Sequence, residues 1–244
     1  MIVRWMAVGF ALWIAIALVF RFAGEMAFHA GPWGVSWLFM IMPLVLFAII
    51  SLLLMILRVT PTDRSEAASI MAVPGLLVGV YEINSFGFVF PNLDPALGAE
   101  FAILMFASYA AVIAAGRKTM NVRWMAVGFA FWLAIAFAFR FGGQLVAQPG
   151  PGGVSWLFLI MPLAFLIITY IVLQAMRVAQ TDRSEAASTI AIPGFLIGIY
   201  EIERFEQLFQ NLDPSLGSEF AALTFACVAA VIVAGIVSSR LESI

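Results

Sequence analysis

Long apolar runs separated by short polar segments dominate the chain. The runs fall near residues 5–22, 35–57, 67–90 and 95–115, and again near 124–141, 154–176, 186–203 and 214–237. A helix needs roughly 20 apolar residues to cross about 30 Å of hydrocarbon. The pattern therefore predicts eight transmembrane helices.

The same pattern occurs twice in the chain, as two repeats offset by 119 residues. Residues 3–116 align with residues 122–235 without a gap, and 69 of the 114 pairs are identical. Such similarity requires the two halves to share a fold and to pack as near equivalents. We expect an all-α, polytopic membrane bundle of two four-helix repeats, residues 1–119 and 120–244.

Composition supports a membrane location. Hydrophobic residues make up 64% of the chain, mean hydropathy is +1.07, and 11% of residues are charged. A soluble domain of this length could not keep such a composition in solution, so we expect the chain to lie in a lipid bilayer. Arg4 precedes an apolar stretch without a small-residue cleavage site, which indicates a first span and not a removable signal. No basic patch suggests nucleic acid.

Basic residues are distributed unequally between the two ends of the predicted spans. Nine lie at one end, and three, Arg21, Arg140 and Arg204, lie at the other. Because lysine and arginine gather on the cytoplasmic side, both termini are predicted to be cytoplasmic. An even number of spans per repeat makes both halves insert in the same direction, related by a pseudo-two-fold axis along the membrane normal.

Polar motifs at the span boundaries have the pattern of helix caps. Asp63 with Glu66, and Asp182 with Glu185, resemble capping boxes that open the third span of each repeat. A cytoplasmic docking loop with Arg64 as its contact is the alternative for Asp63 to Glu66. The sequences Asn92-Leu93-Asp94-Pro95 and Asn211-Leu212-Asp213-Pro214 place a cap before a proline at the first helical position of the fourth span.

Each third span also carries two glycines at four-residue spacing, Gly75 with Gly79 and Gly194 with Gly198. Small residues at this spacing let helices approach closely in lipid. We therefore predict that these four glycines form helix-packing faces.

Each third span carries a glutamate within its apolar run. Glu82 follows Tyr81 and lies seven residues after Gly75, and Glu201 follows Tyr200 in the same way. At 1.5 Å per residue, Glu82 and Arg21 lie at a similar depth on their helices. An ionisable group in this zone is costly unless it is paired or hydrated.

Three interpretations of these glutamates remain open. The first is an ion pair within each repeat, Arg21 with Glu82 and Arg140 with Glu201. The second places the third spans against each other through their glycine faces, which brings Glu82 near Glu201 and creates a proton or cation site. The third is exposure at the outer interface.

Several chemistries lack the necessary residues. His29 is the only histidine and Cys227 the only cysteine, so histidine-ligated haem, metal sites and His-based triads have no ligand set. Lys118, the only lysine, lies between the repeats, so an intramembrane retinal Schiff base has no lysine. We predict no metal and no cofactor, and we expect contact with lipid or an apolar pigment at most.

Three short motifs carry a resemblance to a known family. Phe20-Arg21-Phe22 ends the first span, Pro74-Gly75-Leu76-Leu77 lies in the third, and Phe90-Pro91-Asn92-Leu93 follows it. With these motifs each half resembles a family of small four-span bacterial membrane proteins, domain of unknown function 5367. The second copy departs from the pattern at Gln210, which replaces Pro91. The resemblance implies four helices per unit and a bacterial inner membrane, and it supplies no activity.

Two function classes follow. The first is a non-catalytic structural or accessory membrane protein that packs against lipids or other subunits, because few polar residues face the interior and 23 phenylalanines suit such contacts. The second is a small proton- or cation-coupled transporter that uses Glu82 and Glu201, because one intramembrane glutamate per four-span unit is similar in outline to small multidrug-resistance transporters. An enzyme ranks third, since neither repeat offers a nucleophile with its base.

Overall fold

The computed structural model describes residues 2–28, 36–117, 119, 121–147 and 155–240. His29 and Lys118 lie outside these residues. The described chain is all-helical, and eight of its helices are long and apolar enough to cross a membrane, as predicted. The elements are α1 (Ile2–Ala27), α2 (Ser36–Ile56), α3 (Arg64–Asn84), α4 (Phe86–Val89), η1 (Pro95–Leu97), α5 (Gly98–Ala115), α6 (Val122–Gly142), η2 (Gly143–Leu145), α7 (Ser155–Ala175), η3 (Gln180–Asp182), α8 (Arg183–Glu203), α9 (Phe205–Leu208), η4 (Pro214–Leu216) and α10 (Gly217–Ser238).

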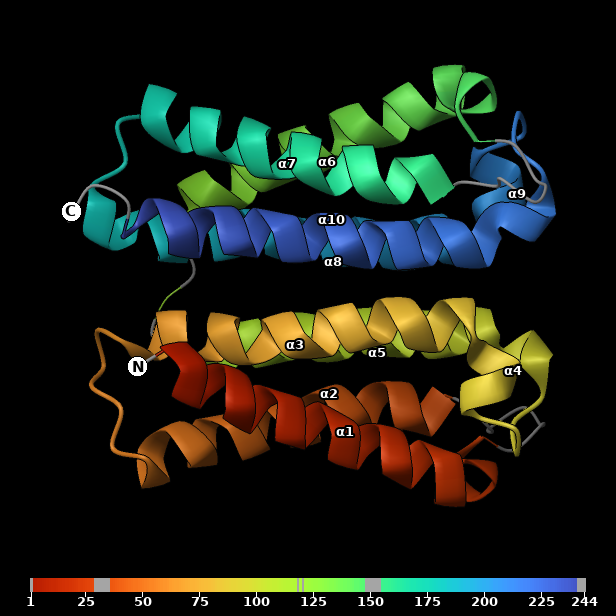
Figure 1. Ribbon diagram of the computed structural model, residues 1–244, viewed down its shortest axis with the longest axis horizontal. Helices are drawn as coiled ribbons and strands as arrows, with labels where there is room; N and C mark the ends of the chain where they lie inside the picture. Colours follow the sequence, from red (N-terminus) through yellow and green to blue (C-terminus); the bar gives the residue numbers. More distant parts are fainter. Residues whose placement is uncertain (1, 29–35, 118, 120, 148–154, 241–244) are drawn as a thin grey trace.

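Of the eight spanning helices in the described chain, α3, α5, α8 and α10 form an inner bundle and the other four cover it (Figure 1). In the first repeat α1 packs on α3 and α2 on α5, and in the second α6 packs on α8 and α7 on α10. Buried residues make up 56–83% of the most apolar stretch of each inner span, against 17–22% in the outer spans. The outer helices therefore present most of their apolar side chains to the surroundings, as helices do in lipid.

The two repeats run in the same direction. Helices α3 and α8 both begin at the end of the molecule that carries the two chain termini, here called the termini end (Figure 1). Contacts between the repeats are reciprocal, because α3 packs on α10 and α8 packs on α5. The hydroxyls of Ser69 and its counterpart Ser188 are hydrogen-bonded at 2.8 Å. Two equivalent residues that touch each other lie on a symmetry axis, so the pseudo-two-fold axis runs along the helices, as predicted.

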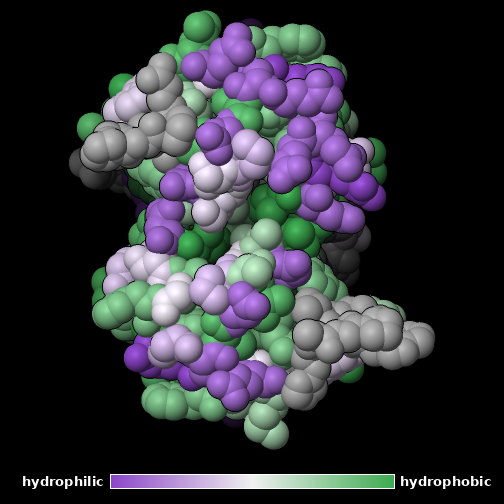
Figure 2. Space-filling view, turned by 90° about the vertical axis from the view of Figure 1, so that its right-hand side faces the viewer, coloured by the Kyte–Doolittle hydropathy of each residue, from purple (hydrophilic) through white to green (hydrophobic). Residues whose placement is uncertain are grey.

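The opposite end, formed around α4 and α9, is polar mainly on the second repeat (Figure 2). There the segment from Glu203 to Gln207 carries four charged or amide side chains, whereas the first repeat has mostly small or apolar residues at the equivalent positions. The two repeats thus share a backbone arrangement and differ in their outer surface.

The cap predictions hold for the fourth spans and are wrong for the third. Asp94 accepts from the Ala96 N–H and Asp213 from the Ser215 N–H, each at 2.9 Å. Asp63 and Asp182 make no such bond. The reason is backbone conformation: Asp94 is extended, with ψ 126°, whereas Asp63 is already helical, with ψ −8°, and a capping side chain needs the extended form.

Candidate functional site

A tryptophan from the first span packs against the third span at Pro74-Gly75, here called the proline-glycine notch. Pro74 lacks an N–H group, and its ring disturbs the hydrogen bonding of the preceding turn of α3. In that turn the Met71 carbonyl accepts from Nε1 of Trp13 at 3.1 Å, and the indole ring lies against Gly75. A side chain at Gly75 would collide with this ring. The second repeat makes the same contact with Trp132, Ile190 and Gly194.

The other two glycines also pack closely, but on aromatic rings instead of on each other. Gly79 faces Phe225 of α10, and its counterpart Gly198 faces Phe106 of α5. These two rings are stacked with their centroids 4.4 Å apart, on the pseudo-two-fold axis. Helices α3 and α8 each pack more extensively on the fourth span of the opposite repeat than on each other. The predicted contact between the two glycine faces is therefore not formed, and the rings separate them.

The two intramembrane arginines bind backbone carbonyls. The third span was predicted to continue to residue 90, but α3 ends at Asn84 and the single turn α4 follows. Arg21 donates from Nη1 to the Val89 carbonyl at 2.5 Å, and Arg140 donates to the Leu208 carbonyl at 2.7 Å. Carbonyls at a helix end lack donors within the helix, so these guanidinium groups satisfy them.

The ion pairs predicted within each repeat are accordingly not formed. Among the described residues, ion pairs join Arg204 to Glu203 and Arg240 to Glu66, and none joins Arg21 to Glu82 or Arg140 to Glu201. The sequence could not indicate the direction of the guanidinium, because that direction depends on the free carbonyls at the end of α4.

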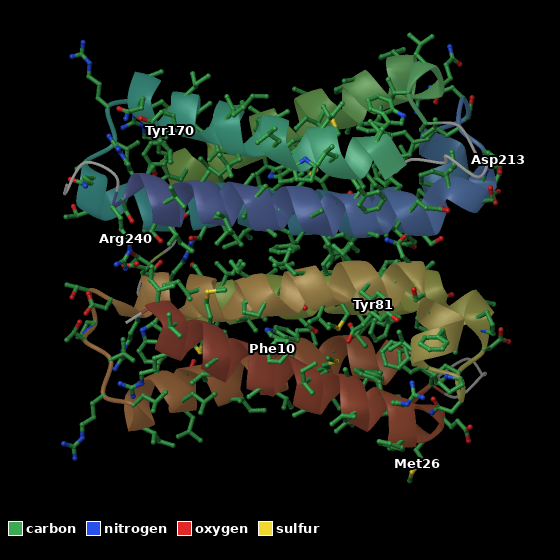
Figure 3. The ribbon with its side chains drawn as sticks, viewed as in Figure 1. Phe10, Met26, Tyr81, Tyr170, Asp213 and Arg240 are labelled. Carbon is green, nitrogen blue, oxygen red and sulfur yellow. The ribbon has the colours of Figure 1, made fainter. Side chains whose placement is uncertain are left out.

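Both glutamates are buried, which excludes the third interpretation, exposure at the outer interface. Glu82 is 4% exposed and Glu201 is 7% exposed, and within the described chain neither carboxyl is hydrogen-bonded. Their neighbours Tyr81 and Tyr200 are more than half exposed, and Tyr81 is labelled in Figure 3. Each tyrosine thus points to a different face of the helix from the glutamate that follows it.

A cleft of about 230 Å³ reaches Glu201 from the side of the bundle. Its walls come from α6, α8 and α9, and they are apolar except for Arg140, Tyr200 and Glu201. The cleft therefore brings together three of the six residues predicted for the intramembrane site. In the first repeat Arg21, Tyr81 and Glu82 occupy the equivalent positions.

The two glutamates have different neighbours, which the sequence reasoning missed. A small second cavity beside Glu201 is lined by Thr224 and Cys227, whose counterparts are Met105 and Ser108. Near Glu82 the first repeat instead places Tyr109, whose ring centroid lies 4.1 Å from that of Trp13. The alignment of the halves could have marked these positions, because they are apolar in one copy and polar in the other.

The arrangement can hold a proton, or a cationic group, against Glu201 in an apolar cleft. In the part of the chain that the structure describes, no three His, Cys, Asp or Glu side chains lie close enough to hold a metal ion. Cys227, the single cysteine, is buried.

Comparison with known proteins identifies one family. The family described as "Family of unknown function (DUF5367)" matches twice, at residues 33–123 and 153–242. Each match covers the second, third and fourth spans of one repeat. No curated protein sequence and no solved structure matches the chain. The chain therefore belongs to this family of unknown function, DUF5367, and carries its domain as a tandem duplication.

Proposed function

We propose that the chain is a non-catalytic structural or accessory component of a membrane, a helical scaffold that packs against lipids or other membrane subunits. The observation that carries this proposal is the aromatic filling of the pseudo-two-fold axis. Phe106, Phe195, Phe225 and Tyr109 pack there with ring centroids 4.4–6.1 Å apart. Where these rings pack together, their close contact leaves no room for a transport path along the axis.

The outer helices offer the surface that a scaffold needs. On α2, Met40 and Leu44 are strongly exposed, and so are their counterparts Leu159 and Leu163 on α7. Continuous apolar faces of this kind suit lipid, an apolar pigment or another membrane subunit. The bacterial inner membrane, with both termini in the cytoplasm, is part of this proposal.

The first test is purification of the full chain from native membranes in mild detergent, followed by mass spectrometry and an absorption spectrum. A scaffold should retain a second subunit or a pigment in fixed stoichiometry. A photoreactive residue at Leu44 or Leu163 should crosslink to that subunit, whereas the same residue at Glu206, outside the spans, should not. A colourless particle of the chain alone, with crosslinks to lipid only, would contradict the accessory role.

The cleft at Glu201 favours a second candidate, a small proton- or cation-coupled exporter. A carboxyl group beside an apolar cleft is able to exchange a proton for a cationic substrate, and ionisable residues within spans are commonly functional. Because this cleft opens on the side of the bundle, a substrate would enter from the membrane and not along the filled axis.

Proteoliposomes with an imposed proton gradient test the exporter, with ethidium as the lipophilic cation. Transport by the wild-type chain that Glu201→Gln abolishes would support this candidate. Glu203→Gln is the matched control, because Glu203 lies on the same helix with its side chain 59% exposed. No gradient-dependent movement of ethidium, or equal loss in both variants, would count against it.

A further inference from the structure

A cavity of about 680 Å³ opens at the termini end, on the seam between the two repeats. Its walls are the first turns of α3 and α8 and the end of α10, so equivalent residues line it from two sides. Arg240, labelled in Figure 3, marks its position. The volume lies within the range of small-molecule sites, roughly 300–1,000 Å³.

The charge of this cavity is strongly negative. Four carboxylates line it, Asp63 and Glu66 from the first repeat and Asp182 and Glu185 from the second, against the single guanidinium of Arg240. Arg240 is ion-paired with Glu66. The positive ends of α3 and α8 also point here, and Glu66 and Glu185 in their first turns offset them. Asp63 and Asp182 remain as surplus negative charge.

These two aspartates are available because they do not cap their helices. Both residues already have helical backbone angles, so their carboxylates do not reach the free N–H groups of the first turn. Among the described residues, Asp63 accepts only from threonine hydroxyls, with Thr60 at 2.7 Å, and Asp182 accepts from Thr181 at 3.0 Å. Each therefore keeps acceptor capacity for a cation.

The neighbouring arginines do not line the cavity. Arg64 and Arg183 donate to backbone carbonyls. Arg117 donates to the Thr189 hydroxyl at 2.6 Å, and burial lowers the pKa of Arg117 to about 10, although the charge of Glu185 opposes this shift. At neutral pH Arg117 is still protonated, and it is held beside α8.

Two buried hydroxyls supply an independent sign of a ligand. Ser65 is 7% exposed and Ser184 is 3% exposed, both line the cavity, and neither hydroxyl has a partner among the described residues. A buried polar group without a hydrogen bond costs about 1–3 kcal/mol, so a bound donor would relieve it. One helical turn deeper, the hydroxyls of Ser69 and Ser188 are hydrogen-bonded to each other on the axis.

We propose that this cavity binds a linear aliphatic polyamine, whose ammonium groups pair with the carboxylates of both repeats and donate to the hydroxyls of Ser65 and Ser184. An anion is disfavoured because carboxylates outnumber the guanidinium four to one. A bare metal ion is disfavoured because no three carboxylates of the described chain converge on one point. Charges spread across a seam match a ligand whose own charges are spaced along a chain.

The test is calorimetric titration of the full chain, in detergent at low ionic strength, with the triamine spermidine. Wild-type protein should bind spermidine saturably. Magnesium chloride that supplies the same concentration of positive charge should not displace the spermidine. Asp63→Asn with Asp182→Asn should weaken binding at least about tenfold, because each removes a charge-assisted hydrogen bond. Ser65→Ala with Ser184→Ala should weaken it by about tenfold while both helices stay intact.

The matched control removes two carboxylates at the opposite end, Glu203→Gln with Glu206→Gln, and should change the dissociation constant by less than about twofold. Protection of the buried Cys227 from a thiol-reactive dye shows that each variant is folded. The proposal is overturned if folded wild-type protein gives no saturable heat of binding. Displacement by magnesium, or an equal loss in the control, overturns it as well, because binding would then be general attraction to a negative surface.

Discussion

Replacing Gly75 by alanine tests the notch that joins the first span to the third. The added Cβ would fall well inside contact distance of three atoms of the Trp13 ring. The ring cannot move away freely, because it packs on Tyr109 with centroids 4.1 Å apart and donates to the Met71 carbonyl at 3.1 Å. The collision must therefore shift α1 relative to α3.

The expected cost follows from three contributions. Overpacking of a core typically costs about 1–3 kcal/mol. Loss of the indole hydrogen bond adds about 1 kcal/mol. Alanine instead of glycine within a helix offsets roughly 0.5–1 kcal/mol of this. The net destabilisation should be about 1–3.5 kcal/mol, which corresponds to a fall in Tm of roughly 2–14 °C for a chain of this size.

The chain provides its own probe and its own control. Cys227 is the only cysteine and is buried, so a thiol-reactive dye reports thermal unfolding in detergent. At Gly142, nothing lies within 4 Å of an added Cβ, so Gly142→Ala should be neutral or slightly stabilising. In a Trp13→Leu background the Gly75→Ala cost should disappear. Equal melting of Gly75→Ala and Gly142→Ala, or a cost that persists without Trp13, would refute the reasoning.

Three further outcomes are expected. Asp94→Ala should lower stability by about 1 kcal/mol through loss of a cap, whereas Asp63→Ala should have almost no effect, and equal losses in thermal melts would show that Asp63 caps α3 after all. Two hydrogen bonds from Ser215 lower the pKa of Asp213 in the folded protein. The ionised carboxylate therefore stabilises the folded state at pH values above the unfolded-state pKa of about 4, and this stabilisation is lost as the pH falls through the lower folded-state pKa. Asp213→Asn, which keeps the acceptor, should therefore flatten the acid side of a Tm-against-pH profile, and an unchanged profile would contradict the assignment. A double-mutant cycle of Ser69→Ala and Ser188→Ala should give a coupling energy of roughly 0.5–1.5 kcal/mol, and additive losses would mean that the bond on the axis contributes nothing.

The architecture can be predicted from the amino-acid sequence alone. Eight apolar runs and a gap-free repeat of 114 pairs predict eight spans in two parallel units, and the structure has them. The caps at Asp94 and Asp213 were also predictable. The length of an apolar run and the position of a proline affect the backbone in the same way wherever the helix is finally packed. They can therefore be interpreted without knowing which side chains surround the helix.

Which side chains contact each other depends on how the helices pack in three dimensions. The sequence indicates that Gly79 and Gly198 need close neighbours, but not that these are Phe225 and Phe106. It predicts Arg21 at the depth of Glu82, yet the guanidinium donates to the Val89 carbonyl at the end of α4.

The cavity at the termini end was likewise hidden from the sequence, where Asp63 and Asp182 have the pattern of caps. Whether such an aspartate caps its helix depends on its ψ angle, and the surrounding turn fixes that angle. Their meeting on one seam depends in addition on how the two repeats pack. Contacts across an axis join residues more than a hundred positions apart, and no local pattern in a single sequence records them.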